Sequence, residues 1–69
     1  MKLSARNQVK GTITRIAKGA TTSHVSIDTG GTVLMASITN EAVADLKLEI
    51  GKQAYAVIKA SDVMVGTDD

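Results

Sequence analysis

Three segments of this chain are largely apolar on both strand faces, and the chain has too few residues to bury both of these faces. The segments are residues 33–38, 54–58 and 63–65 in a sequence of 69 residues. Successive side chains of a strand point to opposite faces, and a solvated antiparallel strand keeps one face polar. A chain of this size buries a modest share of its surface, and monomers rarely expose large apolar patches. The pattern therefore predicts a second buried surface, which we expect to be an interface between subunits.

Composition leaves oligomerisation as the main means of stabilising so small a domain. The sequence has no Cys and one His, which excludes disulfides, thiolate metal sites and a multi-histidine metal site within one chain. A net charge of +1 without a basic block does not indicate a nucleic-acid partner. No apolar run is long enough to span a membrane, and no signal-peptide core follows Met1 and Lys2. We expect one domain over residues 1–69, located in the cytoplasm, with no membrane partner.

Alternation of apolar and polar residues runs through most of the chain. In the first such segment Val9, Gly11 and Ile13 alternate with polar residues, as in a strand with one buried face. The alternation slips at Arg15 and Ile16, which predicts a bulge or sharp bend of the kind that small barrels use. We expect five strands, the last of them short, at residues 9–17, 23–28, 33–39, 53–59 and 62–65.

Turns and one short helix connect these strands. Gly30 and Gly31 supply the positive φ that a tight hairpin needs, and Gly51 marks another turn. Asn40 is expected to cap the helix, because its side chain can accept an N–H of the first turn. The order of three strands, a helix and two strands predicts a mainly β fold, a five-stranded, partly open barrel of the OB type with one short helix. Residues 66–69 are expected to be a frayed tail.

Two small polar and basic clusters lie near opposite ends of the sequence. The first is residues 4–8, and the second includes Lys59 and Ser61. Together they offer two hydroxyls, a guanidinium and an ammonium, all of which can donate hydrogen bonds. Arginine presents a planar fork to oxygen anions and lysine a mobile point charge. The set suits a small oxyanion. Since we find no nucleophile–base pair, carboxylate dyad or metal cluster, we do not expect an enzyme.

Four segments, residues 4–8, 11–13, 38–39 and 57–61, closely resemble the molbindins, and residues 4–8 are the most specific of them. Molbindins are small cytoplasmic proteins that bind molybdate and tungstate, and the resemblance covers residues 2–65. It implies a Mop/TOBE-like domain with an OB-like barrel. It also implies a homohexamer, built as a trimer of dimers with exchange of strand segments between partners. Molybdate or tungstate would be the bound ligand at subunit interfaces, with no organic cofactor and a role in molybdenum storage and homeostasis.

The resemblance also implies the residues of the main oxyanion site at a subunit interface. They come from the opening motif, the end of the third strand and the lysine segment: Ser4, Arg6, Thr39, Lys59 and the backbone N–H of Ala60, with Ser61 as a further donor. Some relatives have serine at the position of Ala60, so that a hydroxyl is absent here while the backbone N–H is retained.

A second oxyanion site of the family lies near the threefold axis. The candidates for it belong to the loop after the first strand and its surroundings: Lys18, Gly19, Ala20, Thr21, Thr22 and His24. A turn that contains glycine can present backbone N–H groups to an anion, and one lysine from each of three subunits would add positive potential.

A pocket made only of donors fits the chemistry of molybdate, a tetrahedral dianion that is fully deprotonated near neutral pH. Phosphate carries a proton at that pH, and its O–H would be left without an acceptor. Sulfate has the same charge and would be excluded only by its size. Tungstate is nearly as large as molybdate, so the residues do not rank these two anions.

Other interpretations remain open at this stage. Taken singly, Arg6 and Lys59 are ordinary surface charges, and His24 is a solvent-facing or interface residue. An OB fold that binds single-stranded nucleic acid uses aromatic stacking platforms and a basic groove. This chain has one aromatic residue, Tyr55. A purely structural oligomerisation module would show the same apolar strands. The motifs do not separate storage from buffering or delivery, nor do they give the number of occupied sites.

Overall fold

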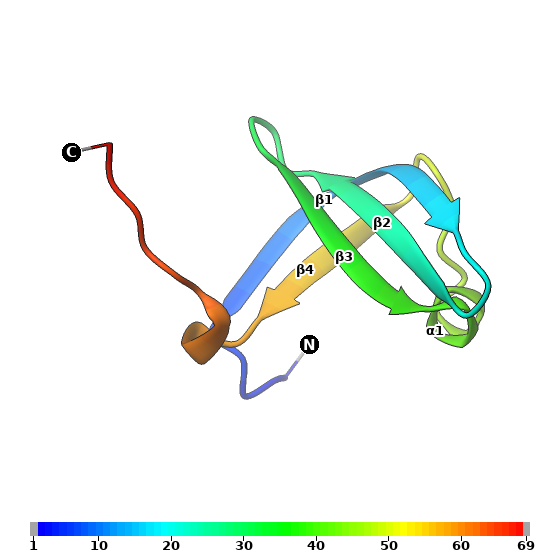
Figure 1. Cartoon of the computed structure of the whole chain (residues 1–69), viewed down its shortest axis with the longest axis horizontal. Coiled ribbons are helices and arrows are strands. Elements are labelled where there is room, and N and C mark those ends of the chain that lie inside the picture. Colours follow the sequence, from blue (N-terminus) through cyan, green and yellow to red (C-terminus); the bar gives the residue numbers. More distant parts are fainter. Residues whose placement is uncertain (1, 69) are drawn as a thin grey trace.

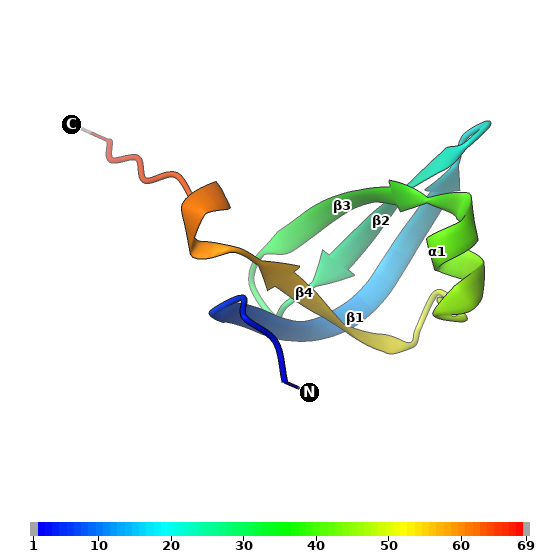
Figure 2. The same ribbon diagram turned by 90° about the horizontal axis from the view of Figure 1, so that it is seen from below.

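The computed structural model describes residues 2–68 and contains one antiparallel sheet and one short α-helix (Figure 1). The strands are ordered β3-β2-β1-β4 in the sheet, which is curled into a half-barrel with β3 and β4 on opposite sides of the curl (Figure 2). The mainly β class and the single short helix are thus confirmed. In chain order the elements are β1 (Asn7–Lys18), β2 (Thr22–Asp28), β3 (Val33–Thr39), α1 (Asn40–Asp45), β4 (Gln53–Ile58) and the 3₁₀ helix η1 (Ala60–Asp62).

The prediction of a fifth strand at residues 62–65 is wrong for the single chain. Asp62 ends η1, and residues 63–68 have no regular structure and lead away from the sheet (Figures 1 and 2). A strand needs an edge that accepts its backbone hydrogen bonds, and η1 directs this segment away from the free edges of β3 and β4. The four strands therefore leave the barrel incomplete. Of the predicted frayed tail, Asp69 lies outside the described residues.

The long strand β1 connects the two halves of the curled sheet, one formed with β4 and the other with β2. Its first half pairs with β4 and its second half with β2, and the register with β2 shifts between Ile13 and Arg15. The predicted bulge is therefore present, one residue earlier than the alternation indicated. A bulge adds twist and bends the strand, which lets one strand follow the curl of the sheet. At Gly11 the two halves approach so closely that a Cβ would lie 2.5 Å from the carbonyl oxygen of Asp28.

The core of the half-barrel is small. Ile13, Val25 and Ile27 are its buried apolar residues. Around them, partly buried apolar residues of the sheet, of α1 and of the loop after it complete the packing: Ile16, Ile38, Val43, Leu48, Ala54 and Ala56. Large apolar side chains of the edge strands stay in solvent, since Met35 is 69% and Tyr55 50% exposed. The apolar pattern of these strands thus leaves the unpartnered apolar surface that the sequence predicted.

The cap of α1 differs from the prediction by one residue. The hydroxyl of Thr39 accepts the N–H of Ala42 at 3.0 Å, so Thr39 is the N-cap and Asn40 is the first helical residue. Threonine and asparagine both cap helices, which is why the sequence pattern did not separate them. The glycine turns are confirmed at Gly30 and Gly51, which have φ of 96° and 93°, but Gly31 does not adopt the positive φ expected of it. Among residues 2–68 no helix has both the length and the apolar character needed to cross a membrane.

Candidate functional site

The fold brings the two ends of the sequence together. Because Asn7 pairs with Ile58, the segments before β1 and after β4 leave the sheet side by side (Figures 1 and 2). Five of the six residues assigned to the main site therefore share one end of the sheet. We name them the terminal cluster, and all are exposed in the single chain: Ser4, Arg6, Lys59, Ala60 and Ser61.

Two amide side chains hold the segments of the terminal cluster in place. The Nδ2 group of Asn7 donates to the carbonyl of Ile58 at 3.1 Å and so links the start of β1 to the end of β4. The Nε2 group of Gln8 donates back to the carbonyl of Ala5 at 3.3 Å. The sequence pattern alone did not reveal these positioning roles. The signal was available, because two amide residues follow directly after Arg6.

The turn after β4 leaves a backbone donor for a ligand. The N–H of Asp62 donates to the carbonyl of Lys59 at 2.9 Å, which directs that carbonyl into η1. In a trans peptide the carbonyl and the following N–H point in opposite directions. The N–H of Ala60 therefore points away from the turn, and it has no acceptor among the residues that the structure describes.

Within residues 2–68 the positive charge of the terminal cluster has no carboxylate partner. In the described part of the chain the one ion pair joins Lys52 to Glu49, at 3.4 Å. The guanidinium of Arg6 and the ammonium of Lys59 are thus free to attract an anion. Over residues 2–68, His, Asp and Glu side chains form no group of three that could hold a metal cation. The terminal cluster thus presents hydrogen-bond donors and two cations, a set that suits an anion.

Thr39, the sixth residue assigned to the main site, lies at the other end of the sheet. It pairs with Thr22 beside α1, while the terminal cluster lies at the start of β1 (Figure 1). The 12 residues of β1 span roughly 35 Å between these ends. One chain therefore does not bring the Thr39 hydroxyl to Arg6. That hydroxyl accepts the N–H of Ala42 and keeps its own proton to donate.

The candidates for the second site lie close to Thr39. The loop of residues 19–21 joins β1 to β2, and Thr21 accepts the N–H of Asn40 at 2.9 Å. His24 shares one face of the sheet with Thr22, because alternate residues of a strand point the same way. Lys18 pairs with Ser23 and belongs to the opposite face. The structure thus gathers the loop beside Thr39 and places Lys18 and His24 on different faces.

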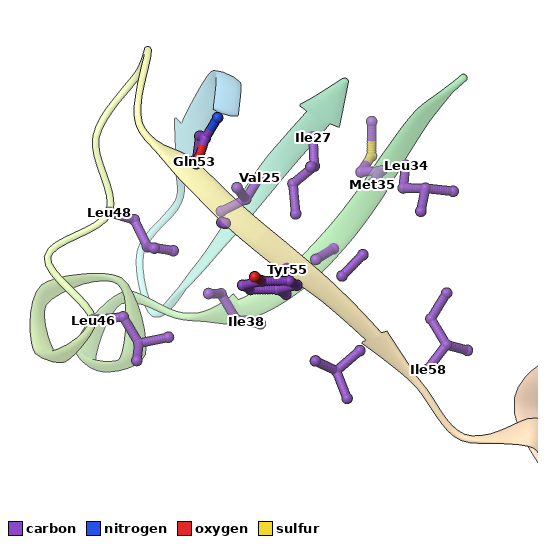
Figure 3. A pocket seen from close by; sticks show the side chains of 14 residues that line it. Val25, Ile27, Leu34, Met35, Ile38, Leu46, Leu48, Gln53, Tyr55 and Ile58 are labelled. Carbon is purple, nitrogen blue, oxygen red and sulfur yellow. The ribbon is translucent and has the colours of Figure 1, made fainter. Parts of the chain in front are cut away.

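An apolar trough lies between the free edges of β3 and β4. Its volume is about 620 Å³, and side chains of β2, β3 and β4 line it, with Leu46 and Leu48 at one end and Ile58 at the other (Figure 3). Gln53 and Tyr55 are its few polar side chains. A site this apolar does not suit an oxyanion, but it fits an apolar segment of chain.

Comparisons with known proteins find related sequences and structures over nearly the full length of this chain. The TOBE domain model matches residues 3–65. A probable molybdenum-pterin-binding protein of Haemophilus influenzae is 51% identical over 69 residues, covering 99% of this chain and 100% of that protein. A molybdate-binding protein from Sporomusa ovata superposes with a TM-score of 0.92 at 39% identity, covering 97% of this chain and 100% of that one. The cytoplasmic molybdate-binding protein ModG, solved with molybdate bound, gives 0.88 at 45% identity, covering 93% of this chain and 46% of its own.

Proposed function

Since the chain belongs to the TOBE domain family and, within it, to the Mop-type molybdate-binding proteins known as molbindins, we propose that it binds molybdate and does not act as an enzyme. The observation that carries the proposal is the terminal cluster, in which two cations without an ion-pair partner among residues 2–68 lie beside hydroxyl and backbone donors. Molybdate has four oxygens that accept hydrogen bonds and none that donates. Tungstate matches it in charge and shape, so we include tungstate as a ligand.

The main site, in this proposal, lies between subunits. Ser4, Arg6 and Lys59, with the N–H of Ala60 and the hydroxyl of Ser61, come from one subunit, and Thr39 comes from a neighbouring copy. The distance between the two ends of the sheet supports this division. The exposure of the terminal cluster supports it too, because donors that are fully hydrated bind an anion weakly until a partner excludes water. The two structures of ModG suggest a cooperative binding mechanism for that protein, which accords with a site shared between subunits.

We further propose that the oligomer is a homohexamer, a trimer of dimers in which strand segments are exchanged. The free edges of β3 and β4, the apolar trough between them and the apolar residues 63–65 are the supporting features. The segment 62–65 of one copy would add the missing strand to the half-barrel of its partner. Val63 and Val65 would then enter the trough, and backbone groups that are unpaired at both edges would find partners.

Replacing Val65 by aspartate is expected to break up the oligomer. A carboxylate in the trough would be buried without a partner, which costs about 3 kcal/mol or more, so the subunits should dissociate at roughly hundredfold higher protein concentration. Thr67→Asp places the same charge in the tail outside the exchanged segment and is the matched control. Multi-angle light scattering over a dilution series measures the mass of both variants. If Val65→Asp keeps the mass of the unmodified protein at every concentration, segment 62–65 is not exchanged.

In the cell, the proposed role is storage and homeostasis of molybdenum in the cytoplasm. We assign the loop of residues 18–22 and His24 to a second class of oxyanion site. Each threefold assembly would bring three copies of this loop together. The chain would thus hold molybdate in two kinds of site, both built from hydrogen-bond donors.

Isothermal titration calorimetry with molybdate, tungstate, sulfate and phosphate tests the function directly. We expect molybdate and tungstate to bind with micromolar or tighter dissociation constants, since several charge-assisted hydrogen bonds of ~1.5–3 kcal/mol each converge on the anion. Phosphate should give no heat, because its proton finds no acceptor in the site. Absence of heat with both molybdate and tungstate would contradict the proposed function and would favour a purely structural oligomerisation module.

A further inference from the structure

Asn40 connects the candidate loop of the second site to the start of α1 through three hydrogen bonds. Its backbone N–H donates to the carbonyl of Thr21 at 2.9 Å. Its side-chain Nδ2 donates to the carbonyl of Gly19 at 3.0 Å. Its Oδ1 accepts the hydroxyl of Ser23, which is 2% exposed. The resemblance to known proteins assigns no role to Asn40, and the sequence pattern presented it only as a helix cap.

The orientation of the Asn40 amide follows from these partners. A carbonyl oxygen only accepts hydrogen bonds, so the nitrogen of the amide must face Gly19. Its oxygen then faces the buried hydroxyl of Ser23, which donates to it. Ser23 therefore fixes the side chain from within the sheet. A flipped amide would place its oxygen against the Gly19 carbonyl, so that two acceptors would face each other.

These bonds decide which backbone groups the loop presents to solvent. The carbonyls of Gly19 and Thr21 are both held against Asn40. Because a trans peptide points its carbonyl and its N–H in opposite directions, the N–H of Ala20 points away from Asn40. Over residues 2–68 the N–H groups of Ala20 and Thr21 have no acceptor. The carbonyl oxygens of Gly19 and Thr21, which carry partial negative charge, thus face Asn40. Among the described residues the N–H groups of Ala20 and Thr21 stay free to donate to a ligand.

We propose that Asn40 is a positioning residue for the second oxyanion site, which it prepares by holding the Gly19 and Thr21 carbonyls away from the anion. The inference rests on the proposed function, since it concerns the same ligand. Asn40 does not touch the anion in this scheme. It acts through the N–H of Ala20, and without it the loop carbonyls could turn outward and repel a dianion. Asn40 also directly follows Thr39, so the same residue holds the loop next to the Thr39 hydroxyl.

Nuclear magnetic resonance of the unmodified protein provides the first test. During a molybdate titration the amide proton of Ala20 should move downfield as it begins to donate to the anion. The amide of Ala60, in the main site, should respond as well. If Ala60 responds and Ala20 does not, the inference is overturned and the proposed function stands. If no amide responds to molybdate, the proposed function fails, and this inference fails with it.

The variant Asn40→Ala provides the second test. We expect the response of Ala20 to disappear and the affinity of the second class of sites to fall about tenfold or more, the value of one charge-assisted hydrogen bond. The response of Ala60 and the oligomer mass should be retained. Thr29→Ala is the matched control, because it removes a comparable bond, from the Thr29 hydroxyl to the Thr32 carbonyl at 2.8 Å, in a different loop.

The control separates positioning from general stability. Both substitutions should lower the melting temperature, but only Asn40→Ala should change molybdate binding when each variant is measured well below its own melting point. An Asn40→Ala protein that keeps the Ala20 response and the unmodified affinity overturns the inference. If Asn40→Ala does not fold, the response of Ala20 in the unmodified protein still decides the outcome.

Discussion

Replacing Arg6 by alanine is expected to weaken molybdate binding about a hundredfold and to leave the sheet folded. Arginine can donate two parallel hydrogen bonds to an oxyanion, each contributing ~1.5 kcal/mol or more, and their loss corresponds to about two orders of magnitude in the dissociation constant. Arg6 precedes β1 and is exposed in the single chain, so its loss removes no core contact. Calorimetry gives the affinity, and circular dichroism checks that the sheet is intact.

The matched control for this prediction is Arg15→Ala. Arg15 is also exposed, and it lies within β1 away from both polar ends of the sheet. The two variants lose the same charge, so a general electrostatic effect would weaken binding equally in both. Arg6→Lys should fall between the unmodified protein and Arg6→Ala, because it keeps the charge and loses the planar fork. Wild-type affinity in Arg6→Ala would remove Arg6 from the site.

The second large effect is expected at Gly11, where a methyl group should strongly destabilise the fold. A Cβ at this position would lie 2.5 Å from the carbonyl oxygen of Asp28 and 2.6 Å from Cγ2 of Ile27. The first of these is backbone and cannot rotate away, so the two halves of the curl would have to separate. We expect Gly11→Ala to lose about 3 kcal/mol, or roughly 15 °C in melting temperature for a chain of this size.

Gly31→Ala is the control for that prediction. A Cβ at Gly31 meets nothing within 4 Å, and Gly31 does not have the positive φ of its neighbour Gly30. Its melting temperature should stay within a few degrees of the unmodified protein. Thermal unfolding followed by circular dichroism compares the two variants. Equal melting temperatures for Gly11→Ala and Gly31→Ala would show that β1 and β2 can move apart at little cost.

The strands could be predicted from the sequence because alternation is a local property. The bulge near Ile13 was also visible as a break in that alternation, and the glycine turn at Gly30 was visible as a turn signal. The fifth strand was not predictable in the same way. An apolar segment such as residues 63–65 indicates that it will be buried, but it does not say which chain provides the edge. Pairing between distant or separate segments is set by tertiary packing.

The candidate site was predictable to a similar degree. The chemistry of Ser4, Arg6 and Lys59 could be inferred from residue types, and their shared place follows from the pairing of β1 with β4. The position of Thr39 at the far end of the sheet could not be inferred in this way, because residue types do not say at which end of a sheet a donor lies. The roles of Asn7 and Asn40 depend on bonds to backbone carbonyls, which only the three-dimensional arrangement shows.

In the proposed main site the donors come from opposite ends of two copies, so the affinity for molybdate would depend on the concentration of the protein itself. With Arg6 on one copy and Thr39 on the next, each proposed main site exists only while the copies are together. Mass action then makes the half-saturating molybdate concentration rise as the protein is diluted. A cell could therefore release stored molybdenum by letting the protein level fall, without a separate discharge step.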